Sequence, residues 1–268
     1  FAPSLDVNVN PANPVVGIRS FGADPALVAE LGTAMIRGMR SEGVIATAKH
    51  FPGHGDTATD THHTAPCVDH PMERMEAVEL LPFRRATAAG LEAIMPAHVI
   101  FSALDPDHPA TLSPAVLRGF LRRQLGFGGV IISDAMDMYA VNRFGAAESV
   151  RRAILAGIDL ALLAHLPDQL ALADYVSAMT SPESVARIRR ARAHGRARAA
   201  RHRGRVRPHA APRDTLLPHC VLWWRVSCCA RHRPESVRRS HAAKAILSEL
   251  QAISAHEAER PRLHRLRG

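Results

Sequence analysis

Five short apolar runs alternate with segments that carry helix-start signals, and this alternation constrains the fold more than any other feature. The runs are predicted strands at residues 1–7, 43–51, 91–99, 128–136 and 157–164. Buried strands that alternate with helices are typical of a parallel sheet covered by helices. The sequence therefore predicts an α/β fold.

Proline at a first helical position marks most of the predicted helices. One runs from Asp24-Pro25 to about residue 40, and another from Pro71 to about residue 89. Two more begin at Ser113-Pro114 and at Pro167, and a fifth covers about 146–156.

Polar residues stand at the carboxyl ends of the predicted strands, namely Asp6, Lys49-His50, His98 and Ser133-Asp134. A (β/α)8 barrel builds its site from the loops that follow its strands. No G-x-G-x-x-G turn follows a strand, which disfavours a dinucleotide-binding fold. We therefore predict a partial TIM-like (β/α)8 barrel of about five of eight strands, the other strands being expected before Phe1.

The loop KHFPGHGDTATDTHH, residues 49–63, follows the second predicted strand. Asp60 and His62 lie two residues apart, close enough for the carboxylate to hold the imidazole. Such a pair sets the tautomer and basicity of the ring and makes a general acid/base near neutral pH. The alternative interpretation is a polar surface loop with structural hydrogen bonds.

Asp134 ends the apolar run IISDAM and is the second candidate. A carboxylate at the end of a buried strand is common in catalysis. The alternatives are helix capping or a bond to a loop amide, and Asp137 is interpreted as structural. A metal site is a further alternative, with His50, His54, Asp56, Asp60, His62 and His63 as its candidate ligands. The absence of H-x-H spacing on a strand and the Lys49 cation disfavour it.

The net charge of +9 is unevenly distributed along the 268 residues. Residues 1–186 carry 13 Lys and Arg against 20 Asp and Glu, a net charge of −7, whereas residues 187–268 carry 21 against 5, a net charge of +16. We predict two parts, a barrel segment at 1–186 and an Arg/Ala/His-rich tail at 187–268. For the tail we favour out-of-frame translation without consistent packing from about residue 195 on, and a disordered nucleic-acid-binding extension is the alternative.

Several blocks of the chain resemble family 3 glycoside hydrolases of the β-N-acetylhexosaminidase branch. They are KHFPGHGDTATDTHH, FAPSLDVNVNPANPVVGIRSFGADP, IMPAHVIFSALDPDHPATLSPAVLRGFLRRQLGFGGVIISDAMDM and AGIDLALL, in the family's order and spacing over about residues 1–178. The resemblance implies a TIM-like barrel of which FAPSLDV is the fourth strand.

The resemblance also assigns roles to residues. It implies that Asp134 is the nucleophile, that His62 paired with Asp60 is the acid/base, and that Arg19, Lys49 and His50 bind the sugar. The expected reaction is retaining hydrolysis in two steps, without metal or cofactor.

The implied substrates are terminal β-linked N-acetylglucosaminides, such as muropeptide or chitin fragments. A family 3 β-glucosidase or xylosidase is the alternative, and the Asp60-Thr61-His62 loop disfavours it. Whether water or phosphate accepts the sugar is left open. No apolar run reaches the length of a membrane span. The compartment, cytoplasmic or exported, is left open.

Overall fold

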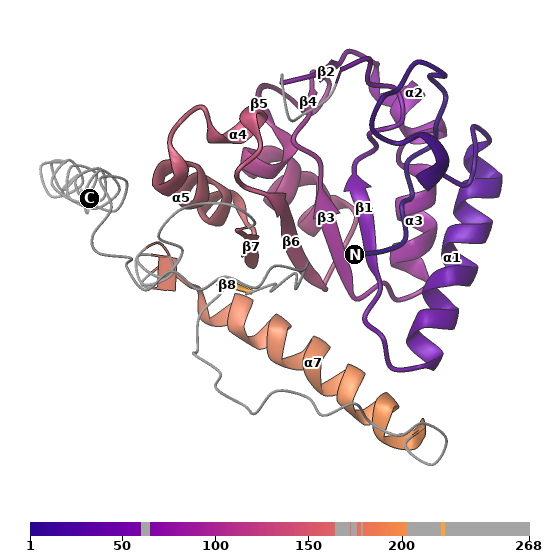
Figure 1. Ribbon diagram of the computed structural model, residues 1–268, viewed down its shortest axis with the longest axis vertical. Helices are drawn as coiled ribbons and strands as arrows, with labels where there is room; N and C mark the ends of the chain where they lie inside the picture. Colours follow the sequence, from indigo (N-terminus) through magenta and orange to yellow (C-terminus); the bar gives the residue numbers. More distant parts are fainter. Residues whose placement is uncertain (60–64, 164–171, 173–175, 178, 203–220, 223–268) are drawn as a thin grey trace, which may run out of the picture.

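The computed structural model describes residues 1–59, 65–163, 172, 176–177, 179–202 and 221–222. Within these residues a five-stranded sheet has the order β1-β3-β6-β7-β8, with every pairing parallel. Its strands are β1 (Thr47–Phe51), β3 (Ala93–Pro96), β6 (Val130–Ala135), β7 (Leu160–Leu162) and β8 (Val221–Leu222). The predicted α/β fold with a parallel sheet is confirmed (Figure 1).

The helices and a second sheet complete the described fold. The helical elements are η1 (Gly17–Arg19), α1 (Pro25–Ser41), α2 (Met72–Ala77), α3 (Leu81–Ala88), η2 (Ala110–Leu112), the π-type η3 (Ala115–Gln124), α4 (Tyr139–Asn142), α5 (Ala146–Ala156) and α7 (Pro182–His202). The second sheet has the order β2-β4-β5 and consists of Cys67–Val68, Ile100–Phe101 and Asp105–Pro109. The sequence did not predict this small sheet. No helix in the described ranges is long and apolar enough to cross a membrane.

Helix starts follow the predicted signals, with one correction. The Asp24 side chain accepts hydrogen bonds from the Ala26 and Leu27 amides and caps α1, as expected. The single helix predicted from Pro71 is instead two helices, α2 and α3. Pro82 has no N–H to donate to the carbonyl of Val78, so one continuous helix cannot pass through it.

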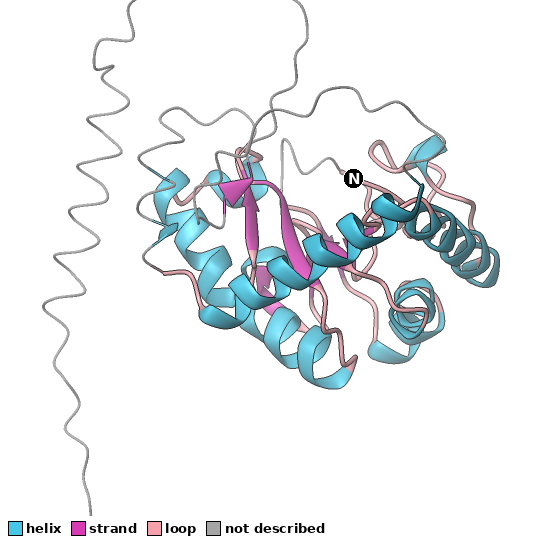
Figure 2. Ribbon diagram, turned by 90° about the horizontal axis from the view of Figure 1, so that it is seen from below, coloured by secondary structure: helices cyan, strands magenta, loops and turns pink. Residues whose placement is uncertain are grey.

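The two faces of the main sheet pack against different helices, because side chains alternate along each strand. Ile94, Ile131 and Ala161 belong to the larger core cluster, which includes buried residues of α1, α3, η3 and α5. The alternate positions point to the other face and form a second cluster, which Ile188 and Ala191 of α7 cover. These positions are Ala93, Met95, Val130, Ile132 and Leu160. Figure 2 shows α7 crossing in front of this face of the sheet.

The segment predicted as a strand at residues 1–7 is not one. Ser4 makes a single parallel bridge with Lys49, supported by hydrogen bonds from Leu5 N to Lys49 O (2.6 Å) and from Lys49 N to Pro3 O (3.1 Å). Pro3 lacks an N–H, which limits the ladder. The segment nevertheless lies along β1, where the predicted first strand would lie.

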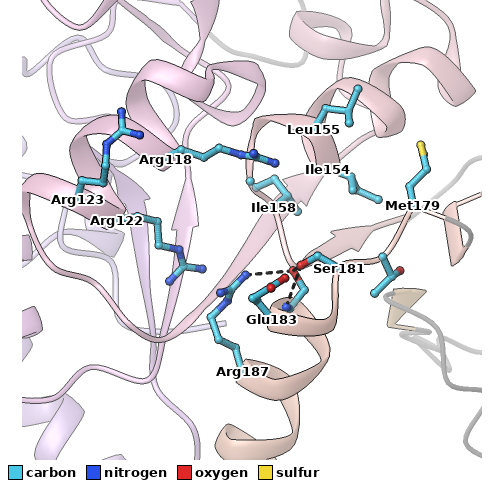
Figure 3. Close-up of a pocket in the computed structure, with 13 residues that line it drawn as sticks. Arg118, Arg122, Arg123, Ile154, Leu155, Ile158, Met179, Ser181, Glu183 and Arg187 are labelled. Carbon is cyan, nitrogen blue, oxygen red and sulfur yellow. Dashed lines mark hydrogen bonds between the residues drawn. The ribbon is translucent and has the colours of Figure 1, made fainter. Parts of the chain in front are cut away.

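Helix α7 crosses the predicted boundary at residues 186–187 and runs to His202. It is anchored by the buried Asp159, which accepts hydrogen bonds from Arg122 (2.7 Å), Arg187 (2.7 Å) and Ser184 (2.6 Å). Figure 3 shows Arg122 and Arg187 side by side at a cavity of about 450 Å³, which lies at the amino end of β7.

From about residue 195 on, where we expect no consistent packing, some of the described residues do contact the α/β part. A Cβ added at Gly195 would lie 3.3 Å from the Gly43 carbonyl oxygen, so α7 is in close contact there. Val221 and Leu222 form β8 and pair with β7. Arginine and alanine are strong helix formers, which explains why α7 continues where the apolar periodicity fails. The helix predicted at Pro167 begins outside the described residues.

Candidate active site

Asp134 lies at the carboxyl end of β6, at the edge of the main sheet that is nearer to the β2-β4-β5 sheet (Figure 1). Its Oδ1 accepts a hydrogen bond from the Ala135 amide (2.8 Å), and its Oδ2 lies 3.7 Å from His50 Nε2. The side chain keeps 22% of its surface exposed, so a carboxylate oxygen remains open to a ligand. The neighbouring Ser133 faces β7 instead, where its hydroxyl accepts a hydrogen bond from Leu162 N.

Two opposing effects act on the pKa of Asp134. Burial is the largest and by itself would raise this pKa. Electrostatic interactions with His50, His98 and Lys49, together with the hydrogen bond from the Ala135 amide, outweigh burial and hold the pKa below its usual value. Asp134 is therefore an ionised, partly accessible carboxylate at neutral pH.

Lys49 and His50 both approach Asp134, although adjacent residues of a regular strand point to opposite faces. The register between β1 and β3 shifts between Lys49 and Phe51, and such irregularities redirect side chains near sites. Burial lowers the pKa of Lys49, Asp134 opposes this effect, and Arg19 adds to the lowering.

Arg19 is exposed on η1, and its Nε donates a hydrogen bond to the Val15 carbonyl (3.1 Å). Its charge acts on Lys49, so the structure brings four of the predicted site residues into one neighbourhood: Arg19, Lys49, His50 and Asp134.

Asp6 is a site residue whose role the sequence did not reveal. It is fully buried, and its Oδ2 lies 2.8 Å from His50 Nδ1. Burial would raise the pKa of Asp6, but His50 and His54 together hold it far below its usual range. The only sequence signal was a carboxylate at the end of an apolar run.

Two further histidines line the same region. His98 Nε2 lies 3.0 Å from the Ala135 carbonyl and Nδ1 lies 2.8 Å from Thr111 Oγ1. His54 Nδ1 lies 2.7 Å from Thr57 Oγ1, and its ring meets that of His50 edge-on, with centroids 5.6 Å apart. Burial is the largest effect on the pKa of both His98 and His54 and lowers it, while Asp134 and Asp6 act in the opposite direction.

The predicted acid/base pair, Asp60 and His62, lies outside the described residues, as does His63. The loop is described on either side of residues 60–64, where His70 Nε2 lies 2.6 Å from Asp56 Oδ2. The region is tightly packed, since a Cβ at Gly55 would lie 1.8 Å from the Val7 carbonyl oxygen.

Only one group among the described residues offers three ligand atoms close enough for a metal ion: Asp56, His70 and Glu79. Arg74 already donates two hydrogen bonds to the Glu79 carboxylate, at 2.8 and 3.0 Å. A cation in that position competes with a metal ion, so the group is better explained as an ion-pair network.

The arrangement around Asp134 suits attack on an electrophilic carbon. An ionised carboxylate is a nucleophile when its lone pairs are accessible, and Lys49 and His50 add hydrogen-bond donors near it. Such donors bind hydroxyl-rich ligands.

Comparison with known proteins gives consistent matches. The profile of the glycosyl hydrolase family 3 N-terminal domain matches residues 1–194. The chain is 42% identical over 198 residues to a beta-hexosaminidase of Thiobacillus denitrificans, covering 73% of this chain and 54% of that protein. It is 39% identical over 178 residues to beta-hexosaminidase A of Pseudoalteromonas piscicida, covering 61% and 29%.

Solved structures agree with these relatives. A family 3 β-N-acetylglucosaminidase from Paenibacillus sp. FPU-7 superposes with a TM-score of 0.69 at 42% identity, covering 81% of this chain and 43% of that one. A β-glucoside phosphorylase superposes with a TM-score of 0.65 at 26% identity, covering 76% and 40%. The chain thus spans about half or less of the length of these proteins.

Proposed function

The chain belongs to glycosyl hydrolase family 3, and on that premise we propose that it is the barrel segment of a β-N-acetylhexosaminidase that removes terminal β-linked N-acetylglucosamine. The observation that carries the proposal is the placement of Asp134. It is an ionised, partly exposed carboxylate at the carboxyl end of a parallel strand, next to His50 and Lys49.

The architecture proposed for the segment is part of a TIM-like (β/α)8 barrel. Residues 1–7, β1, β3, β6 and β7 lie next to one another in chain order, with parallel pairing, as consecutive barrel strands do. The carboxyl ends of these strands carry Asp6, Lys49-His50 and Asp134, which fits a site at that end of a barrel.

The proposed reaction has two steps and retains the anomeric configuration. A carboxylate oxygen of Asp134 attacks the anomeric carbon as the bond to the leaving oxygen breaks, and a glycosyl ester forms. His62, oriented by Asp60, gives its proton to the leaving oxygen. It then takes a proton from water, whose oxygen attacks the anomeric carbon and releases Asp134 as the carboxylate.

Binding of the sugar is assigned to Arg19, Lys49 and His50, whose nitrogen atoms can donate hydrogen bonds to ring hydroxyls. Each step of this mechanism uses side chains alone, and no metal or organic cofactor takes part. Substrates of this class are cell-wall muropeptides and chitin fragments.

A 5-fluoro N-acetylglucosaminyl fluoride tests the nucleophile directly, because it traps the glycosyl ester. Mass spectrometry of a peptic digest should find the label on Asp134. Asp134→Asn should abolish labelling and cut turnover of an aryl β-N-acetylglucosaminide by several orders of magnitude, since the covalent step is lost. Asp107→Asn, an exposed carboxylate on β5, is the control and should label normally. Label on another residue contradicts the assignment.

The acceptor is tested separately, because one structural neighbour is a β-glucoside phosphorylase. Product analysis with and without inorganic phosphate distinguishes free N-acetylglucosamine from its 1-phosphate. We expect the free sugar in both cases. A 1-phosphate that accumulates with phosphate would make the chain a phosphorylase.

The tail remains a separate proposal. We assign the catalytic unit to the first part of the chain and place the basic residues beyond α7 outside it, either as out-of-frame translation or as a nucleic-acid-binding extension. Its excess of positive charge supports this division.

A further inference from the structure

The imidazole of His50 lies between two carboxylates. Its Nε2 is 3.7 Å from Asp134 Oδ2, and its Nδ1 is 2.8 Å from Asp6 Oδ2. Asp134 is partly exposed, whereas Asp6 is completely buried behind the ring. The two ring nitrogens therefore face different surroundings: Nε2 faces the candidate site, and Nδ1 faces the interior.

Asp6 receives four hydrogen bonds from three residues. Its Oδ1 accepts from the amides of His50 (3.0 Å) and His54 (2.8 Å). Its Oδ2 accepts from the Ser4 hydroxyl (2.7 Å) and faces His50 Nδ1. An ionised carboxylate has no proton to donate, so the hydrogen between Asp6 Oδ2 and His50 Nδ1 must belong to the imidazole.

We propose that Asp6 is a positioning residue that keeps a proton on His50 Nδ1 and thereby turns Nε2 toward Asp134 and the sugar. Nε2 then accepts a hydrogen bond from a substrate hydroxyl when the ring is neutral and donates one when the ring is charged. The proposal rests on the proposed function for the role of the sugar, but its geometry concerns only described residues of this chain.

The surroundings of Asp6 prevent it from adjusting to a different ring orientation. Leu5 N donates to Lys49 O (2.6 Å), so the segment that carries Asp6 is tied to the strand that carries His50. The two amides on Oδ1 fix the carboxylate plane. A carboxylate held in this way selects one histidine tautomer, as buried partners of functional histidines do.

Asp6→Asn is a sharp test, because the surroundings dictate how the amide must lie. The two backbone amides require an acceptor at the Oδ1 position, so the asparagine oxygen should lie there. Its NH₂ group then faces His50 Nδ1 and donates to it. The ring can accept that bond only if its proton moves to Nε2. The shape of the site is kept and the tautomer is reversed.

The experiment measures the ring nitrogens of His50 by two-dimensional ¹⁵N NMR on the 268-residue chain, with the signals assigned through His50→Gln. Wild type should show a protonated Nδ1 at all pH values where the chain is folded. Asp6→Asn should show a neutral ring protonated at Nε2. Ser4→Ala is the matched control: it removes one donor from the same carboxylate oxygen and should leave the tautomer unchanged.

Two outcomes overturn the proposal. One is a neutral wild-type ring that carries its proton on Nε2, and this measurement decides the question alone if Asp6→Asn fails to fold. The other is a folded Asp6→Asn chain that keeps the proton on Nδ1. Neither outcome depends on the sugar chemistry.

A kinetic arm connects the tautomer to the site. Asp6→Asn should slow labelling of Asp134 by the 5-fluoro sugar by about 10–100-fold, the usual loss when a histidine loses its orienting partner. Ser4→Ala should reduce the labelling rate by less than Asp6→Asn does. Labelling at an equal rate in wild type and a reversed-tautomer Asp6→Asn would overturn the positioning role. Failure of wild type to label at all would count against the proposed function and leave the NMR result valid.

Discussion

At the scale of single residues, the site depends on carboxylates that stay charged while buried. Burial disfavours the charged form, and neighbouring cations or hydrogen-bond donors must exceed that effect. Asp6 achieves this with two histidines and several donors, and Asp134 with His50, His98 and Lys49. Asp134, the proposed nucleophile, is therefore ionised in its resting state.

The pH dependence of Asp134 labelling follows from this charge balance. Since its pKa lies below the usual value of about 3.9, the ionisation of Asp134 should not itself change the labelling rate as pH falls from 7 to about 5. Protonation should reduce it only at lower pH. His50→Gln removes a cation that lowers this pKa, so the decline should begin at higher pH. An unchanged decline in His50→Gln would show that His50 does not stabilise the Asp134 anion.

The acid/base assignment of His62 predicts a dependence on the leaving group. His62→Ala should reduce hydrolysis of substrates with poor leaving groups by about 10²–10⁴-fold, because they need a proton in the transition state. Substrates with acidic leaving groups should lose much less. Steady-state kinetics on a series of aryl N-acetylglucosaminides measures the difference. Equal losses across the series would exclude His62 as the acid.

At the scale of elements, helix α7 covers one face of the main sheet. Ile188 and Ala191 pack on that face, and Asp159 anchors the amino-terminal turn of the helix. Asp159 accepts from Arg122, from Arg187 and from the Ile131 amide, so a single buried carboxylate joins η3, β6 and α7. A buried carboxylate of this kind is stable only while its partners remain.

Arg187→Ala should therefore lower the free energy of unfolding by about 3 kcal/mol, because it leaves part of the Asp159 charge uncompensated in the interior. Urea denaturation followed by circular dichroism measures this loss. Arg190→Ala removes an exposed arginine from the same helix and should change stability by no more than about 0.5 kcal/mol. Equal effects of the two variants would refute the anchoring role of Asp159.

At the scale of the whole molecule, the chain joins an acidic α/β part to a strongly basic carboxyl-terminal part. The family profile ends at residue 194, inside α7, so the helix belongs to both parts. Beyond α7 the described contact with the α/β part is the pairing of β8 with β7. A two-residue strand buries little surface and adds little stability.

Deletion of residues 223–268 should accordingly leave the melting temperature of the chain and its labelling by the 5-fluoro sugar unchanged. The same deletion should weaken binding to duplex DNA at low salt if the basic part is a nucleic-acid-binding extension, because it removes about half of the Lys and Arg of residues 187–268, and that binding in the full chain should weaken steeply with salt. A lower melting temperature after deletion would show instead that these residues belong to the folded unit.

Much of the fold was predictable because its signals are local. Proline at helix starts, Asp24 as a cap and apolar runs at regular intervals act over a few residues, and the strands at β1, β3, β6 and β7 follow from them. The small β2-β4-β5 sheet was missed because its strands find partners distant in sequence. The split into α2 and α3 and the weak pairing of residues 1–7 were missed although Pro82 and Pro3 are local signals for them.

By itself, the sequence determined the α/β class, the strand ends that carry the candidate site residues, and the resemblance that singled out Asp134, Lys49, His50 and Arg19. Only the tertiary structure showed that Asp6 lies behind His50, 44 residues away, and that α7 covers a sheet face through Asp159. The physical reason is the same in both cases. The charge of a buried carboxylate is decided by the donors that the fold brings to it, and no local pattern records those donors.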